Sequence, residues 1–287
     1  MPTVDIDAGT IHYDTAGPSD GRPVLFIHGY AMGASLWGPL SARLAERNLR
    51  CIAPNWPLGA HPQALRAGAD RTLPGIAAMV DAFMGALGLE DVVLVGNDTG
   101  GLVSQLVAVN HPDRLGALVL TSCDAFEHFP PPIINPFIVA AKTAITFRVA
   151  LQPMRLRAFR HYAYGKLAHR DIHGLVREWV KPALRDAAVA EDLRCLTRSL
   201  NQQTSLDAGA RLSGFTKPAL VAWSADDLFF PVEDGERVAK TLPNARFELI
   251  DGARTYSMID QPDRLADLVA EFASTASGPG VRGQTVS

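Results

Sequence analysis

Short runs of apolar residues recur along the chain, separated by polar or helix-forming stretches. Six of them have the length of buried strands, at residues 24–27, 50–53, 92–95, 117–120, 219–222 and 246–250. Strands buried on both faces of a parallel sheet are apolar along their whole length. Helical periodicity lies between several of these runs, from about Pro74 to Leu87 and from about Gly101 to Asn110. The alternation of strand and helix predicts an α/β fold, with a mostly parallel sheet and helices on both faces.

The long segment between the fourth and fifth runs has helical periodicity and no strand signal. It covers residues 125–216 and opens with the proline cluster 130–132, through which regular structure cannot continue. We therefore expect a helical cap inserted over the sheet, between core segments 1–124 and 217–273. The final residues, 274–287, are rich in Ser, Gly and Thr and are expected to be disordered.

The composition narrows the class of protein. With 47% hydrophobic and 20% charged residues, the chain is typical of a folded globule. A net charge of −3 does not indicate the basic surface that nucleic-acid-binding proteins need. No apolar run approaches the ~20 residues that cross a bilayer, and the first residues lack a secretory pattern. We expect a cytoplasmic protein, a monomer or homodimer that acts on a small molecule.

The sequence indicates neither a metal site nor a long basic run. Cys51, Cys123 and Cys195 lie far apart and show no metal-ligand spacing, so we expect neither a metal nor a cofactor. The densest basic cluster consists of four arginines within one short stretch: Arg148, Arg155, Arg157 and Arg160. Such a cluster usually forms a solvated helical face, and that is the expectation here.

The strongest chemical motif is Gly96-Asn97-Asp98-Thr99-Gly100-Gly101, between a buried run and a helical one. Glycines on both sides of Asp98 permit a sharp turn and close packing of the helix on the strand. This is a nucleophile-elbow pattern with aspartate in place of serine. It places Asp98 at the carboxyl edge of a parallel sheet, where such folds bind ligands. The simpler interpretation is an aspartate that only caps the helix.

Two further motifs each follow a buried run. Phe26-Ile27-His28-Gly29-Tyr30 resembles the His-Gly oxyanion motif of the α/β-hydrolase superfamily. The resemblance implies an oxyanion hole made of the backbone N–H groups of Tyr30 and Thr99. The stretch from Trp223 to Pro231 resembles the acid loop of the same family, where an aspartate stands four residues before a proline.

This alignment selects Asp227 as the residue that would hold the catalytic imidazole, with Asp226 as the alternative. In the family, that histidine stands seven residues before the proline of an Asp-x-Pro element. Here the element is Asp260-Gln261-Pro262 and the aligned residue is Thr255. No histidine follows His173, so the catalytic histidine of the family is absent.

Superfamily members with an aspartate at the elbow include haloalkane dehalogenases and epoxide hydrolases. In both, the carboxylate attacks carbon and a histidine then activates water to hydrolyse the ester. The resemblance covers about residues 20–125 and 215–272. It implies an α/β-hydrolase fold with Asp98, Asp227 and Thr255 at its catalytic positions.

Several other residues are candidates for contact with substrate: His28, Trp37, Asp124, Tyr162 and Tyr164. The two tyrosines would protonate an epoxide oxygen, although ordinary packing in the cap is the alternative. Asp124 follows a buried run and is an alternative triad acid. If it and Asp227 both face Asp98, repulsion between like charges raises at least one carboxyl pKa.

Three functions remain open at this point. The first is hydrolysis of a small, largely apolar ester or epoxide, with Asp98 as nucleophile or acid–base group. The second is a lyase, isomerase or cyclase reaction, which needs no activated water. The third is a binding protein that has lost turnover. For each, we expect Thr255 to face the cleft beside Asp227, which would bond Arg254, the Thr255 hydroxyl or nearby backbone N–H groups.

Overall fold

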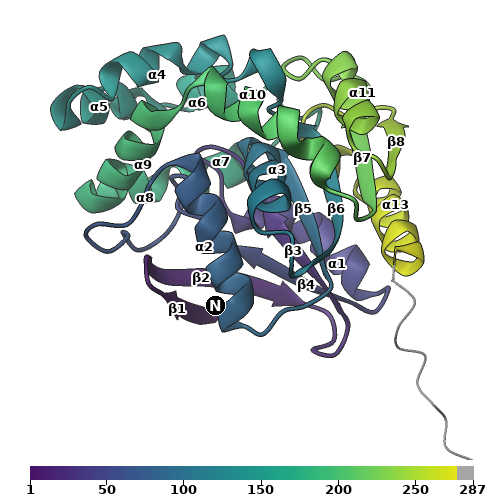
Figure 1. Ribbon diagram of the computed structural model, residues 1–287. Coiled ribbons are helices and arrows are strands. Elements are labelled where there is room, and N and C mark those ends of the chain that lie inside the picture. Colours follow the sequence, from purple (N-terminus) through teal and green to yellow (C-terminus); the bar gives the residue numbers. More distant parts are fainter. Residues whose placement is uncertain (277–287) are drawn as a thin grey trace, which may run out of the picture.

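An eight-stranded sheet forms the centre of the molecule (Figure 1). The computed structural model describes residues 1–276. The strands are β1 (Thr3–Ile6), β2 (Gly9–Ala16), β3 (Arg22–Ile27), β4 (Leu49–Pro54), β5 (Val92–Asp98), β6 (Leu115–Cys123), β7 (Ala219–Ser224) and β8 (Ala245–Ile250). Their order across the sheet is β1-β2-β4-β3-β5-β6-β7-β8. The pairings of β2 with β1 and β4 are antiparallel and all the others are parallel.

All six strands that the apolar runs predict are present, and they form the parallel part of the sheet. No apolar run predicts the antiparallel hairpin of β1 and β2. In β2, Ile11 and Tyr13 are buried, while Thr10 and His12 are partly exposed, so buried and exposed residues alternate. In an edge hairpin with one solvent-exposed face, apolar and polar residues alternate along each strand. Such a strand contains no continuous apolar run, which is the signal used to predict strands.

Helices cover both faces of the sheet. The helices α2 (Leu73–Ala86), α3 (Thr99–Asn110) and α11 (Val232–Thr241) pack on one face, and α1 (Gly38–Ala45) and α13 (Pro262–Thr275) pack on the other. Alternate residues of β3 therefore enter different cores. Leu25 clusters with Phe83 of α2, whereas Phe26 clusters with Leu40 of α1. The predicted α/β-hydrolase fold, with helices on both faces, is confirmed.

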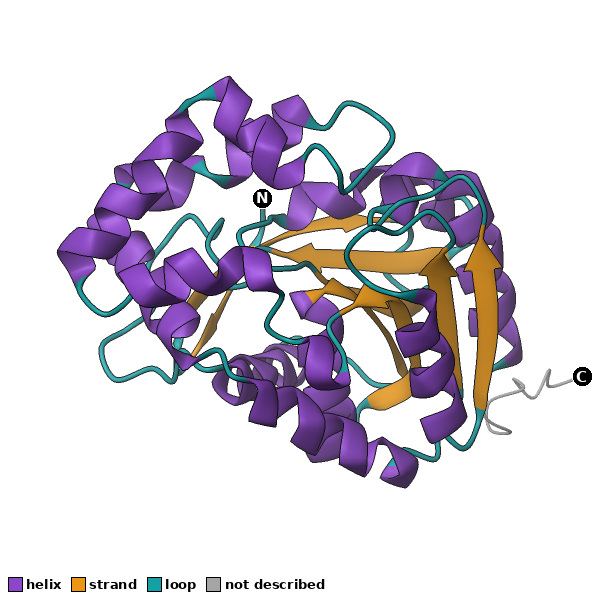
Figure 2. Ribbon diagram, turned by 90° about the horizontal axis from the view of Figure 1, so that it is seen from above, coloured by secondary structure: helices purple, strands orange, loops and turns teal. Residues whose placement is uncertain are grey.

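The chain between β6 and β7 forms helices and no strand, and all of it lies within the described residues. Its longer helices are α4 (Asn135–Ala140), α5 (Ala144–Leu151), α6 (Arg157–Tyr164), α7 (His173–Trp179), α8 (Lys181–Arg185), α9 (Ala187–Ser199) and α10 (Gln202–Arg211). We refer to residues 126–214 as the helical segment. Its helices form a layer beside the strands, seen from above in Figure 2. The tail expected to be disordered lies mostly outside the described residues.

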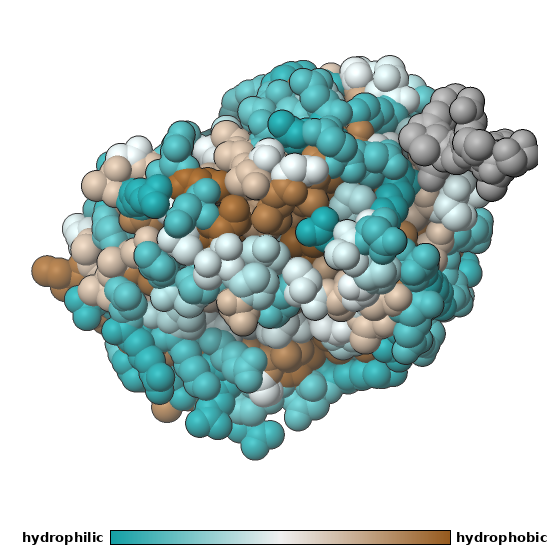
Figure 3. Space-filling model, turned by 90° about the horizontal axis from the view of Figure 1, so that it is seen from below, coloured by the Kyte–Doolittle hydropathy of each residue, from teal (hydrophilic) through white to brown (hydrophobic). Residues whose placement is uncertain are grey.

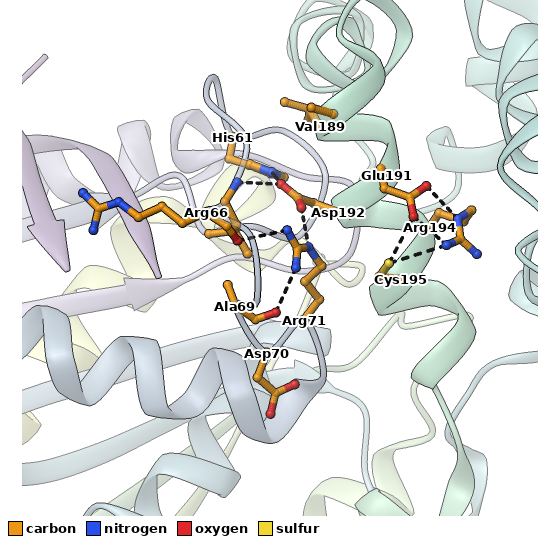
Figure 4. Close-up of polar contacts among 12 residues, drawn as sticks. His61, Arg66, Ala69, Asp70, Arg71, Val189, Glu191, Asp192, Arg194 and Cys195 are labelled. Atoms are coloured by element: carbon orange, nitrogen blue, oxygen red, sulfur yellow. Dashed lines mark hydrogen bonds and ion pairs between the residues drawn. The ribbon is translucent and has the colours of Figure 1, made fainter. Parts of the chain in front are cut away.

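A buried ionic network ties the helical segment to the core (Figure 4). Asp192 of α9 accepts hydrogen bonds from Leu65 N–H (2.8 Å), His61 (3.2 Å) and Arg71 (2.5 Å), all in the loop between β4 and α2. Asp192 is 2% exposed. A buried carboxylate is stable only when it is paired and hydrogen-bonded, and Asp192 meets both conditions. The network therefore fixes α9 over the carboxyl ends of the strands.

The surface is polar over most of the face in Figure 3, with hydrophobic residues gathered near its middle. Several of the exposed large apolar side chains belong to α4 and α5: Val139, Ile145 and Val149. In the part of the chain that the structure describes, no helix has the length and apolar character needed to cross a membrane.

We predict that Gly100→Ala destabilises the protein by roughly 3 kcal/mol, as backbone overpacking does. A Cβ atom at this position would lie 2.2 Å from the carbonyl oxygen of Ile27 and 2.4 Å from that of His28. Both are backbone atoms of a central strand and its loop, so they cannot move aside cheaply. Urea denaturation measures the change.

The matched control is Gly174→Ala in α7, where a Cβ meets no atom within 4 Å. Alanine favours helix over glycine by about 1 kcal/mol, so this variant is expected to be at least as stable as wild type. Equal stabilities of the two variants would contradict the close packing of α3 on the sheet.

Candidate active site

Asp98 lies at the sharp turn between β5 and α3. Its backbone has φ 56° and ψ −136°, a conformation that side-chain-bearing residues adopt rarely and at a cost. The neighbouring glycines make the turn possible. A Cβ at Gly96 would lie 2.3 Å from the hydroxyl of Ser104. The elbow that the sequence predicts is therefore present, and its strain is held by the strand and the helix on either side.

Two backbone N–H groups converge on one oxygen of the Asp98 carboxylate. Thr99 N–H donates to Oδ1 at 2.6 Å and Tyr30 N–H donates to the same atom at 3.2 Å. Gly29 allows this approach, because a Cβ there would lie 2.2 Å from Oδ1. The two N–H groups expected to form an oxyanion hole thus hold the side chain of Asp98 itself.

Burial is the main influence on the charge of Asp98. It raises the pKa of this carboxyl to about 6, although the N–H groups of Thr99 and Tyr30 favour the ionised form. Repulsion from Asp227 adds to the increase in pKa. Asp98 is therefore largely ionised at pH 7, and its protonated form becomes populated just below neutrality.

The expected contact between Thr255 and Asp227 is present, but neither residue lines the cavity beside Asp98. The Thr255 side chain is fully buried, and its hydroxyl donates to Asp227 Oδ1 at 3.0 Å. The same oxygen accepts the N–H groups of Phe229 (2.8 Å) and Phe230 (3.1 Å). The other oxygen, Oδ2, is buried without a hydrogen bond among the described residues. Burial raises the pKa of Asp227, and the two N–H groups partly offset the increase.

Neither alternative to this pairing is seen among the described residues. Asp226 is exposed and bonds His169 at 2.9 Å. Arg254 was a possible partner of Asp227, but its backbone N–H donates to Asp260 at 3.0 Å, and no bond joins it to Asp227.

Asp124 brings a third carboxyl to the same region. It is 2% exposed, and its Oδ2 accepts the Thr99 hydroxyl at 2.7 Å while Oδ1 is unpaired. Burial raises its pKa well above the ordinary value, and repulsion from Asp98 adds to this. The pKa values of Asp98, Asp124 and Asp227 are thus all raised, in agreement with the crowding expected from the sequence.

A cavity of about 110 Å³ opens beside Asp98 and Thr99. Its walls come from the sheet loops and from the helical segment, and most of them are apolar, including Leu151, Met154, Trp179, Val180 and Leu193. Such a pocket with few polar groups fits a small, largely apolar molecule whose reacting atom faces Asp98. Leu193 directly follows Asp192, so the ionic network in Figure 4 also fixes one wall.

Two of the residues expected to contact substrate, His28 and Trp37, are fully buried and do not line this cavity. The His28 ring accepts Trp56 N–H at Nε2 (2.9 Å) and donates from Nδ1 to Gly29 O (3.0 Å). Burial lowers the pKa of His28 to about 4, so the ring is neutral and structural. Trp37 stacks on Phe26 with ring centroids 4.8 Å apart.

Only one of the two expected tyrosines reaches the cavity. Tyr164 lines it, and its hydroxyl donates to Ala31 O at 3.1 Å. Tyr162 is 70% exposed and does not line the cavity, because residues two apart on a helix point to different sides. The sequence analysis gave no role to the Tyr30 side chain, which also lines the cavity and whose hydroxyl lies 2.6 Å from that of Thr197.

No histidine replaces the missing one. All eight histidines of the chain lie within the described residues, and none hydrogen-bonds to Asp98. His128 bonds Asp234 (2.6 Å), and His173 lies 3.4 Å from Arg160. Residues 1–276 also contain no group of three or more His, Cys, Asp or Glu residues placed to hold a metal ion.

The raised pKa of Asp98 predicts a pH-dependent stability. A folded-state pKa of about 6, against an ordinary 3.8, means that ionisation of Asp98 costs stability as pH rises through this range. Asp98→Asn removes that cost. As pH rises from about 4 to about 8, the free energy of unfolding of the variant is expected to increase by up to about 3 kcal/mol relative to that of wild type. Urea denaturation at both pH values tests this, with the exposed Asp226→Asn as control. A constant difference between Asp98→Asn and wild type across the range contradicts it.

Comparison with known proteins identifies the family of the chain. The chain is 28% identical over 284 residues to a non-heme chloroperoxidase of Streptomyces lividans, covering 93% of this chain and 99% of that protein. It is 26% identical over 282 residues to the 2-hydroxy-6-oxononadienedioate/2-hydroxy-6-oxononatrienedioate hydrolase of Paraburkholderia phymatum, covering 93% of each.

Among solved structures, the haloalkane dehalogenase DbeA from Bradyrhizobium elkani superimposes with a TM-score of 0.78 at 18% identity. The match covers 96% of this chain and 97% of that one, and it shows a shared fold. Residues 22–262 match the family model described as alpha/beta hydrolase fold. The chain therefore belongs to the α/β-hydrolase fold family.

Proposed function

We propose that this protein is a hydrolase of a small, largely apolar epoxide or ester, with Asp98 as its nucleophile. One observation carries the proposal: Asp98 Oδ1 is held by Tyr30 N–H and Thr99 N–H, at the wall of an apolar cavity. The carboxylate is thereby fixed in orientation, and Oδ2 is the oxygen left to attack. The helical segment would then act as the cap that closes the cavity.

The first chemical step is attack of Oδ2 on an electrophilic carbon. With an epoxide, the Oδ2–carbon bond forms, the ring carbon–oxygen bond breaks, and the ring oxygen takes up a proton. We assign the proton donation to the hydroxyls of Tyr30 and Tyr164, which line the cavity and would exchange their bonds to Thr197 and Ala31 for one to the ring oxygen. Burial raises the pKa of both, so both carry their proton at neutral pH.

An epoxide fits this step better than an ester does. Attack of a carboxylate on an acyl carbon gives a mixed anhydride, which is a high-energy product. Attack on an epoxide carbon releases ring strain and gives an ordinary alkyl ester of Asp98. Oδ1 is the carbonyl oxygen of that ester, and it stays on the two N–H groups of Tyr30 and Thr99.

The second step is hydrolysis of the Asp98 ester. Water adds to the carbonyl carbon, and the negative charge develops on Oδ1, where the two N–H groups already point. The bond between this carbonyl carbon and Oδ2 then breaks, and Oδ2 leaves as the second hydroxyl of the diol with the proton that the base took from water. The water oxygen replaces Oδ2 in Asp98, and the new Asp98 carboxyl returns its proton to the tyrosine that protonated the ring oxygen. A base must take the proton of the water, and we assign this role to Asp227. Its carboxylate is close enough to Asp98 for the two charges to repel each other, and burial raises its pKa above the ordinary value.

Family membership supports a hydrolytic reaction, since the similar proteins include the hydrolase of Paraburkholderia phymatum. The competing candidate is an acid–base enzyme such as a lyase, isomerase or cyclase. It is favoured by an Asp98 pKa of about 6 without a histidine partner, because a group that titrates near neutrality exchanges protons readily.

Asp227→Asn is expected to separate the two steps. The variant retains Asp98, so incubation with an aryl epoxide adds the mass of the epoxide to the protein. Without the base the ester persists, and turnover falls by about a hundredfold or more. Mass spectrometry of the intact protein measures the adduct, and Asp98→Asn is the control that forms none. Turnover by wild type with no adduct on Asp227→Asn would favour the acid–base candidate instead.

The pH dependence of the reaction distinguishes a nucleophile from an acid. Because Asp98 must be ionised to attack, kcat/KM is expected to rise with pH through about 6 and then level off, with a tenfold loss per unit well below it. Asp226→Asn, on the same loop but exposed, leaves the profile unchanged. Activity that increases as pH falls below 6 would mean that Asp98 works in its protonated form.

A further inference from the structure

A second hollow, of about 280 Å³, lies in the helical segment. It is bounded by α6, by the loop after it and by α7. Tyr164 lines both this hollow and the apolar cavity beside Asp98, so the two spaces share a wall. The chemistry of the two differs, because polar residues dominate here.

Positive charge gathers in this hollow. Arg157, Arg160 and Arg170 line it, and Asp171 is its one acidic lining residue. Within the described part of the chain, none of the three arginines forms an ion pair with a carboxylate. Asp171 is exposed, and its carboxylate accepts the N–H of His173 at 2.8 Å. The three arginines and Asp171 together therefore give the lining an excess of two positive charges.

Arg160 differs from the other two arginines because it is buried, with 8% of its surface exposed. Nη1 donates to the carbonyl oxygens of Met154 and Arg155, each at 2.8 Å, and Nη2 lies 3.4 Å from His173 Nε2. Its Nε is buried with no acceptor among the described residues. A buried cation is costly unless a negative charge compensates it, and two carbonyl groups supply only partial charges. This arginine is not part of a solvated helical face, contrary to the expectation from the sequence.

The neighbouring titratable groups do not supply the missing negative charge. Burial, followed by repulsion from Arg157 and Arg160, lowers the pKa of His173, so this ring is neutral at pH 7. His169 bonds Asp226 at 2.9 Å, which leaves that carboxylate engaged outside the hollow. Asp260 is already saturated by backbone N–H groups of His169, Arg170 and Arg254.

We propose that this hollow binds a small oxyanion, a carboxylate or a phosphate, at a site separate from Asp98. Guanidinium groups present paired N–H donors that match both anions bidentately, and charge-assisted bonds of this kind are among the strongest hydrogen bonds in proteins. Arg157 and Arg170 are exposed at the rim and close on an anion from outside. Arg160 supplies the fixed charge at the buried side.

Isothermal titration of the full chain with sodium phosphate and with sodium acetate tests this, with sodium chloride at equal ionic strength as the blank. We expect saturable binding of at least one anion. The double variant Arg157→Gln/Arg170→Gln weakens it by at least about tenfold. Arg148→Gln/Arg185→Gln removes the same charge from exposed positions of the helical segment outside the hollow, and leaves binding unchanged.

All four substituted arginines are exposed, so both double variants are expected to retain the fold. A change in binding therefore reports on the anion site and not on unfolding. Preference for phosphate or for acetate identifies which oxyanion the site takes. Absence of binding by both anions overturns the proposal. Equal weakening in the two double variants also overturns it, since that result means a general charge effect. Neither result bears on the role of Asp98.

Discussion

The site depends on two backbone N–H groups directed at one carboxylate oxygen. Tyr30 lies in the loop after β3 and Thr99 is the first residue of α3, and their N–H groups meet because β3 and β5 are adjacent parallel strands. This arrangement offsets two costs at once: the strained backbone of Asp98 and the burial of its charge. It also explains the glycines at 29 and 100, where any side chain would displace the loop or the helix.

The sequence predicts the parts of the structure that depend on local pattern. Continuous apolar runs identify the parallel strands, and the flanking glycines identify the turn at Asp98. These two signals arise from backbone geometry, which neighbouring residues largely determine. The contact of Thr255 with Asp227, 28 positions apart, is predicted by resemblance to the α/β-hydrolase family instead.

Side-chain direction is less accessible from the sequence. His28 and Trp37 stand next to the right loops, yet both point into the core. Tyr162 and Tyr164 are equivalent in the sequence, and the rotation of α6 alone decides which one lines the cavity. Arg160 is buried by a second helix whose docking no local pattern reveals. Such outcomes depend on tertiary packing, and a single chain carries no sequence marker for them.

The hydrogen-bond network around Asp192 determines which walls of the cavity can be changed to accept other molecules. Because His61, Leu65 and Arg71 all bond one carboxylate of α9, the wall next to Leu193 is anchored to the loop between β4 and α2. The walls from α4 and α5 have no ion pair among the described residues and expose apolar side chains outward. Engineering for bulkier compounds therefore belongs on α4 and α5, where substitutions widen the pocket without releasing the anchored side.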